Sequence, residues 1–132
     1  MAEDQVRTTT LRTPLGRVRG LGSAKSGVRH WWVQRVTSAA LLPLTLWFVI
    51  SAALLAGATH AETVAWIARP WNAVLLLLTI GLSFYHTALG AQVIFEDYIN
   101  QEWLRMAYIL GVKALCWLLG LAAALAVLRI AV

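Results

Sequence analysis

Charged residues and cysteine are both scarce in this 132-residue chain. Only 13% of its residues are charged and 60% are hydrophobic, whereas soluble domains contain about 25% charged residues. The single cysteine, Cys116, excludes an internal disulfide and a cysteine-ligated iron–sulfur cluster held by this chain alone. A soluble fold of this length has too little interior for so many apolar side chains. The composition therefore predicts an integral membrane protein.

Three long stretches almost without charge predict three transmembrane helices in an all-α fold. They occupy about residues 36–59, 70–95 and 104–128. The 24 residues of the first would form a helix of about 36 Å, enough to cross a hydrocarbon core of about 30 Å. The chain is thus predicted to consist of a basic N-terminal segment, residues 1–35, and a three-helix membrane domain, residues 36–132.

The cations are distributed unevenly between the two sides of these spans. Seven of the eleven Lys and Arg residues precede residue 36 and Arg105 lies on the same side, whereas Arg69 and Arg129 lie on the other. Cytoplasmic loops are enriched in Lys and Arg, so this distribution predicts an internal N-terminus and an external C-terminus. We interpret the basic segment as an orientation signal that contacts anionic lipid. A role in nucleic-acid binding is not indicated, because no aromatic stacking platform precedes Trp31.

His86 and Lys113 lie inside the predicted spans, where such groups are costly and usually face the interior of a helix bundle. His86 lies well within the second span. Its imidazole either donates a hydrogen bond to a neighbouring helix or ligates a metal or haem. Lys113, about 13 Å into the third span, either extends toward the inner surface or contacts an anionic group of a cofactor.

Helical geometry relates His86 to the end of its span. Asp97 follows after eleven residues, which is about three turns plus 20°, so both residues project from nearly the same face about 16 Å apart along the axis. Gly90 lies between them on that face and leaves space for a flat group. Tyr98 adds an apolar ring and a hydroxyl at the membrane boundary.

The entrance to the first span carries polar groups on the same side of the membrane. Arg35 is the last cation before the apolar stretch, and either anchors the helix at the surface or offers a donor fork to a buried carboxylate. Thr37 and Ser38 are expected to hydrogen-bond to their own helix. We expect His30 to lie at the interface and His60 to be solvated in the outer loop.

This combination of features resembles the membrane-anchor subunits of succinate dehydrogenase, specifically the smaller, D-type anchor. Those subunits have three spans, a basic N-terminal segment, and a Trp/Gln/Arg-containing entrance to the first span. Their second span carries a His, ten residues and then Asp-Tyr. The matching residues here are His-Trp-Trp-Val-Gln-Arg-Val-Thr at positions 30–37 and His86 with Asp97-Tyr98. The resemblance extends from His30 to Leu128.

The resemblance implies a role for each of these residues. His86 corresponds to an axial ligand of haem b whose second ligand comes from the larger cytochrome b anchor subunit. Tyr98 corresponds to a hydrogen-bond donor to ubiquinone, and Asp97 would support that site. Arg35 would lie near the haem propionates. The chain itself would be a non-catalytic anchor, because it has neither a dinucleotide-binding motif nor a cysteine cluster.

The implied partners are an iron–sulfur subunit and a flavoprotein subunit, which would carry the chemistry of the tricarboxylic acid cycle enzyme. The expected location is a bacterial inner membrane, with the mitochondrial inner membrane as the less favoured alternative, and the chain would lie within a hetero-oligomeric helix bundle. Two other classes stay open. In a haem-free structural assembly subunit, His86 would be an interhelical hydrogen-bond donor. In a small homo-oligomeric transporter or pore, His86 and Lys113 would line a path, although a pore gives no reason for the Asp97-Tyr98 pair.

Overall fold

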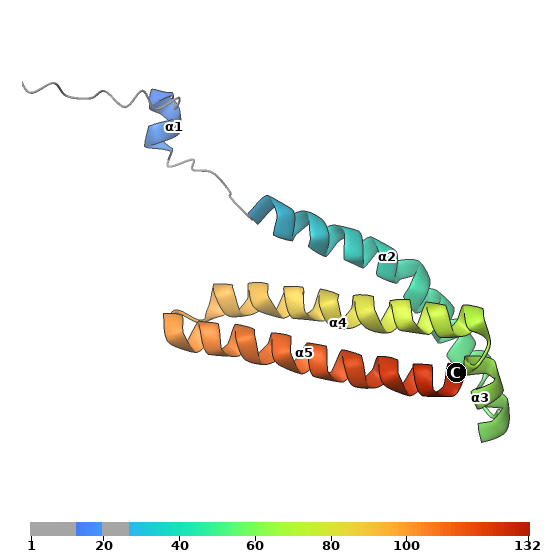
Figure 1. Ribbon diagram of the computed structural model, residues 1–132. Coiled ribbons are helices and arrows are strands. Elements are labelled where there is room, and N and C mark those ends of the chain that lie inside the picture. Colours follow the sequence, from blue (N-terminus) through green and yellow to red (C-terminus); the bar gives the residue numbers. More distant parts are fainter. Residues whose placement is uncertain (1–12, 20–26) are drawn as a thin grey trace, which may run out of the picture.

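The computed structural model describes residues 13–19 and 27–132, and this part of the chain is almost entirely helical. The helices are α1 (Pro14–Val18), α2 (Gly27–Leu54), α3 (His60–Ile67), α4 (Pro70–Tyr98) and α5 (Glu102–Ala131), as Figure 1 shows. Helices α2, α4 and α5 have 28, 29 and 30 residues and are long and apolar enough to cross a membrane. The prediction of an all-α fold with three long apolar helices is therefore confirmed.

The first long helix lies nearer the N-terminus than the apolar stretch 36–59. It begins at Gly27, so the polar residues that precede the apolar stretch are also helical. Pro43 lies inside this helix. It ends at Leu54, shortly before Gly57, whose φ of +91° is a conformation that only glycine adopts without steric cost. The residues at the entrance to the first span therefore lie on a regular helix rather than in a loop.

A short capped helix, α3, connects α2 to α4. The side chain of Glu62 accepts hydrogen bonds from the backbone N–H and the hydroxyl of Thr59, at 2.7 and 2.8 Å. The Thr59 hydroxyl in turn accepts one from the backbone N–H of Glu62 at 3.3 Å. The Thr59 backbone N–H, and secondarily its hydroxyl, lower the pKa of Glu62 from its usual 4.5. The resulting stabilisation is fully present above that value and is lost as the pH falls through the lowered pKa.

The long helices form an antiparallel arrangement in which α4 packs against both α5 and α2. Figure 1 shows α4 and α5 side by side along their length, with α2 running at an angle across them. The start of α2 and the α4–α5 connection lie at one end of the molecule, while α3 and the C-terminus lie at the other (Figure 1). This alternation is the one that three consecutive membrane spans require.

Glycine allows close approach at two of these helix contacts. A Cβ added at Gly90 would lie 3.3 Å from Nε2 of Gln34, and one added at Gly120 would lie 3.3 Å from the ring of Phe84. Gly90 therefore marks the contact of α4 with α2, and Gly120 marks that of α5 with α4. Neither Gly81 nor Gly111 has an atom within 4 Å of such a Cβ.

A single copy of the chain buries few of its apolar side chains. One small core lies at the α3 end, where Trp47 and Trp66 stack with ring centroids 5.7 Å apart beside Leu76. Cys116 is buried, as expected for a small apolar side chain, whereas Trp117 is exposed. Most large apolar side chains of the described residues point outward, where lipid and other transmembrane helices can cover them.

Candidate functional site

His86 lies half-buried where α4 packs against α2, and each of its ring nitrogens faces a polar side chain of α2. Nδ1 is 2.9 Å from the hydroxyl oxygen of Thr37, and Nε2 is 3.3 Å from Nε2 of Gln34. The structure thus contains the interhelical hydrogen bond that was one of the two interpretations of this residue. Such a bond is compatible with metal ligation, because a ligating histidine normally holds its second ring nitrogen in a hydrogen bond.

The surrounding groups determine which ring nitrogen carries the proton. The hydroxyl oxygen of Thr37 is 2.8 Å from the carbonyl of Val33 and 3.1 Å from that of Gln34, and it donates its one proton to its own helix. With that proton used, the oxygen can accept a hydrogen bond from His86, an arrangement that corresponds to the tautomer with the imidazole proton on Nδ1. The amide of Gln34 donates to Nε2. In that tautomer the lone pair is on Nε2, the nitrogen through which the ring would bind a metal.

Polar groups extend along this contact in both directions. His30, Gln34 and Thr37 recur at the spacing of one helix face, and Gln34 and Thr37 lie opposite His86 and Gly90 of α4. We call these five residues the polar seam. Two of its atoms, Oε1 of Gln34 and Nε2 of His30, are buried without a hydrogen-bond partner. Buried polar atoms are rarely left unsatisfied, so the seam has capacity for a further polar group.

Arg35 lies beside the polar seam without contacting His86. It follows Gln34 directly, so its backbone is at the depth of His86 while its side chain projects about 100° further around α2. The guanidinium is exposed and lies 5.3 Å from the ring centroid of Trp31, in a cation–π contact. The expected backbone hydrogen bond of Ser38 is present, with its hydroxyl donating to the carbonyl of Arg35 at 2.8 Å.

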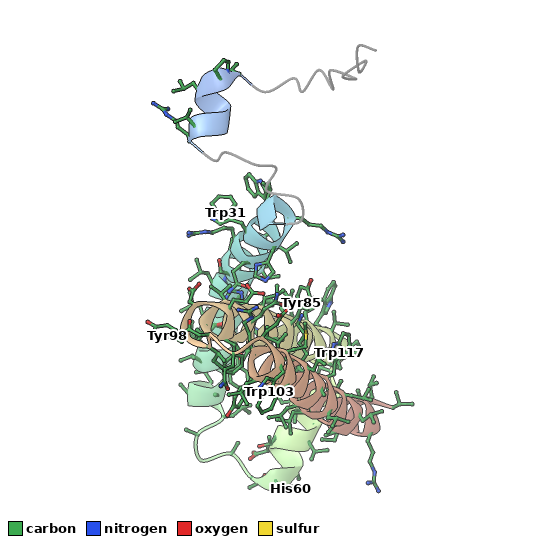
Figure 2. The ribbon with its side chains drawn as sticks, turned by 90° about the vertical axis from the view of Figure 1, so that its left-hand side faces the viewer. Trp31, His60, Tyr85, Tyr98, Trp103 and Trp117 are labelled. Carbon is green, nitrogen blue, oxygen red and sulfur yellow. The ribbon has the colours of Figure 1, made fainter. Side chains whose placement is uncertain are left out.

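Asp97 and Tyr98 lie at the end of α4, about three turns from His86, and both are exposed. Tyr98 is 82% exposed, and Figure 2 shows it on the side of the bundle away from Tyr85 and Trp117. The four residues predicted to form the site therefore do not meet in one pocket of this chain. His86 belongs to a helix contact, while Asp97 and Tyr98 are available to groups outside the chain.

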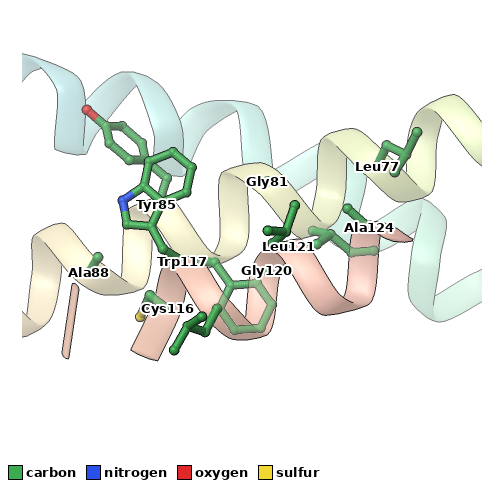
Figure 3. Close-up of a pocket in the computed structure, with 12 residues that line it drawn as sticks. Leu77, Gly81, Tyr85, Ala88, Cys116, Trp117, Gly120, Leu121 and Ala124 are labelled. Atoms are coloured by element: carbon green, nitrogen blue, oxygen red, sulfur yellow. The ribbon is translucent and has the colours of Figure 1, made fainter. Parts of the chain in front are cut away.

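Two hollows accompany these residues. One, of about 400 Å³, is an apolar groove between α4 and α5 with Tyr85 and Trp117 on its wall, and none of the predicted site residues line it (Figure 3). The other, of about 360 Å³, lies beside the polar seam and is lined by His30, Gln92, Glu96 and their neighbours. Within it, Gln92 donates to Glu96 at 2.7 Å. The first hollow suits packing, and the second has a polar lining.

The described residues do not gather a set of side chains that would hold a metal ion by themselves. Within residues 13–19 and 27–132, no group of three or more His, Cys, Asp and Glu residues could hold one. His86 offers one ring nitrogen toward a metal, Nε2, which faces Gln34. The structure therefore defines a class of protein: a three-span membrane subunit with a polar contact that includes His86 between two of its helices.

Comparison with known proteins identifies the family. Residues 9–120 match the family described as the succinate dehydrogenase/fumarate reductase transmembrane subunit. The succinate dehydrogenase hydrophobic membrane anchor subunit of Rickettsia bellii is 36% identical over 107 residues, covering 80% of this chain and 85% of the relative. The same subunit of Rickettsia typhi is 38% identical over 95 residues, covering 71% and 75%.

The corresponding subunit of Paracoccus denitrificans is 31% identical over 100 residues, covering 76% of this chain and 78% of the relative. The chain belongs to the family of succinate dehydrogenase hydrophobic membrane anchor subunits. The resemblance inferred from its motifs is thereby confirmed. No solved structure matches the chain.

Proposed function

We propose that this chain anchors a succinate:ubiquinone oxidoreductase in the membrane and that His86 ligates its haem b through Nε2. The observation that carries the proposal is the half-buried imidazole between α2 and α4, whose Nδ1 lies 2.9 Å from the Thr37 hydroxyl while Nε2 faces the amide of Gln34. Membership of the family supports the role as an anchor of the oxidoreductase, and the residues of the polar seam support the binding of haem b. When bound, haem would supply a one-electron redox centre between the two anchor subunits.

The residues of the seam fit a flat iron-containing group. Gly90 has no side chain on the face where the group would lie, and the neighbouring Gln34 has an orphaned carbonyl oxygen. The side chain of Gln34 would have to rotate away before Nε2 of His86 could bind iron, because the Gln34 amide lies 3.3 Å from that nitrogen. Arg35, at the same depth, would reach the propionates by leaving the ring of Trp31. The second axial ligand would come from the larger cytochrome b anchor.

Tyr98 and Asp97 would form this chain's part of a ubiquinone site. The exposed hydroxyl of Tyr98 would donate a hydrogen bond to a quinone oxygen and stabilise the negative charge that develops as the quinone accepts two electrons. Two protons from the inner aqueous side complete the reduction to the quinol, and the neighbouring Asp97 carboxylate would orient Tyr98 or pass on a proton. The iron–sulfur subunit would close the site over these residues.

The placement of cations supports an internal N-terminus. Arg29, Arg35 and Arg105 belong to the end that holds the start of α2 and the α4–α5 connection, whereas Arg69 and Arg129 belong to the opposite end (Figure 1). By the positive-inside rule, the first end faces the cytoplasm across a bacterial inner membrane. The iron–sulfur and flavoprotein subunits would dock there, and the larger anchor would cover exposed apolar faces of the bundle.

Purification of the chain from its native membrane tests the assembly. We expect a flavoprotein, an iron–sulfur protein and a second multi-span subunit to copurify, with one b-type haem per complex measured by its reduced-minus-oxidised spectrum. A complex of the same subunits without haem would support the assembly-subunit alternative and reject the ligand role of His86. A homo-oligomer without soluble partners would instead support the transporter or pore alternative.

Filling the space at Gly90 should hinder haem binding. Because overpacking costs about 1–3 kcal/mol, Gly90→Leu should lower the haem affinity about 5- to 150-fold, measured as the haem-to-flavin ratio of the purified complex. Gly81→Leu is the matched control on the same helix, because a Cβ there has no atom within 4 Å. An equal haem content in both variants would show that the bound group does not lie over Gly90.

A further inference from the structure

Thr37 is the most deeply buried polar residue among those described, with 6% of its surface exposed. Its hydroxyl oxygen lies between two groups. It is 2.9 Å from Nδ1 of His86, and it donates a hydrogen bond to the carbonyl of Val33 at 2.8 Å. A hydroxyl has one proton, and here it points to the helix carbonyl. The oxygen is therefore left as an acceptor for the imidazole N–H.

The two hydrogen bonds of the His86 ring are unequal in a way that distinguishes its two nitrogens. At Nδ1 the partner is short, buried and β-branched, so it has little rotational freedom in a helix. At Nε2 the partner is the longer, more flexible Gln34, at 3.3 Å and with its own carbonyl oxygen unsatisfied. Thr37 thus holds one side of the ring firmly, and Gln34 can leave the other side.

We propose that Thr37 is a positioning residue for His86, which fixes the proton on Nδ1 and presents Nε2 as the ligand to haem iron. This inference rests on the proposed function of His86. By accepting from Nδ1–H, Thr37 makes Nε2 more basic, and its own donation to Val33 strengthens that effect through the chain of hydrogen bonds. It also sets the rotation of the ring, because the acceptor is fixed on α2 while the imidazole belongs to α4.

The test compares four variants of the complete complex purified from membranes: Thr37→Val, Thr37→Ala, Thr37→Ser and Thr79→Val. The first two remove the hydroxyl, and Thr37→Ser restores it. Thr79→Val is the matched control, because its hydroxyl donates only to Leu75 of its own helix, at 2.7 Å. The readouts are the midpoint potential of the haem and its low-spin electron paramagnetic resonance spectrum.

We expect the midpoint potential to rise in Thr37→Val and Thr37→Ala. A less basic imidazole stabilises ferric iron less strongly. A tenfold decrease in the equilibrium constant that favours ferric over ferrous iron raises the midpoint potential by about 59 mV for one electron. The low-spin spectrum should shift with it, because the ring is no longer held at one angle. Thr37→Ser and Thr79→Val should keep the potential and the spectrum of the unmodified complex.

The outcomes separate this inference from the proposed function on which it rests. If both hydroxyl-free variants keep the original potential and spectrum while His86→Ala loses the haem signal, the role of Thr37 is rejected and the ligand assignment stands. Failure of both variants to assemble, with Thr37→Ser intact, would make Thr37 a structural residue and also reject its role. An unchanged haem spectrum in His86→Ala would reject the proposed function itself.

Discussion

Replacing His86 with alanine should remove haem from the complex. The haem-to-flavin ratio is expected to fall more than about 100-fold, because loss of a residue that merely supports a metal ligand already costs about 10- to 100-fold in affinity. The measurement is the b-type absorbance of complexes purified in parallel. Assembly of the three other subunits should persist in part, since the exposed faces of α2, α4 and α5 do not depend on this side chain.

His60→Ala is the matched control for that experiment. His60 is exposed at the first residue of α3, at the end of the molecule opposite the start of α2 (Figure 2). The control should retain the haem content of the unmodified complex. If His86→Ala retained a normal low-spin spectrum as well, His86 would be only the interhelical hydrogen-bonding residue that the structure shows, and the iron ligand would lie in another chain.

Replacing Tyr98 with phenylalanine should lower the turnover number for quinone reduction about 100- to 1,000-fold. That range is the usual effect of removing one donor to a developing negative charge. The change deletes one hydroxyl from a side chain that packs against little of this chain, so the complex should still assemble. Succinate-dependent reduction of quinone measures the effect, and reduction of a soluble artificial acceptor shows that the flavoprotein and iron–sulfur subunits still work.

Tyr108→Phe is the matched control. The ring of Tyr108 stacks on Phe95 with centroids 5.4 Å apart near the same end of the bundle, and phenylalanine preserves that stacking. This variant should reduce quinone normally. Equal quinone reduction by Tyr98→Phe and the unmodified complex would place the quinone away from α4. A change in KM alone would indicate that Tyr98 contributes to binding rather than to charge stabilisation.

The residues that α2 contributes to the polar seam were visible in the sequence, but their contact with His86 of α4 was not. His30, Gln34 and Thr37 lie at helix spacing, so a shared face could have been recognised once residues 27–35 were read as helix. Thr37 was expected to hydrogen-bond to its own helix, and it does so. Its second bond, to His86, joins residues 49 positions apart. No local pattern specifies which face of α2 meets α4.

The class of protein and the order of its helices could be read from the amino-acid sequence, because a bilayer demands long apolar helices whose backbone groups bond internally. The sequence also determined the spacing of His86, Asp97 and Tyr98, since one continuous helix connects them. The end of α2 and the residues that face the imidazole became known from the folded chain. Those features depend on the turn at Gly57 and on the contact of Gly90 with Gln34, where packing between distant segments sets the geometry.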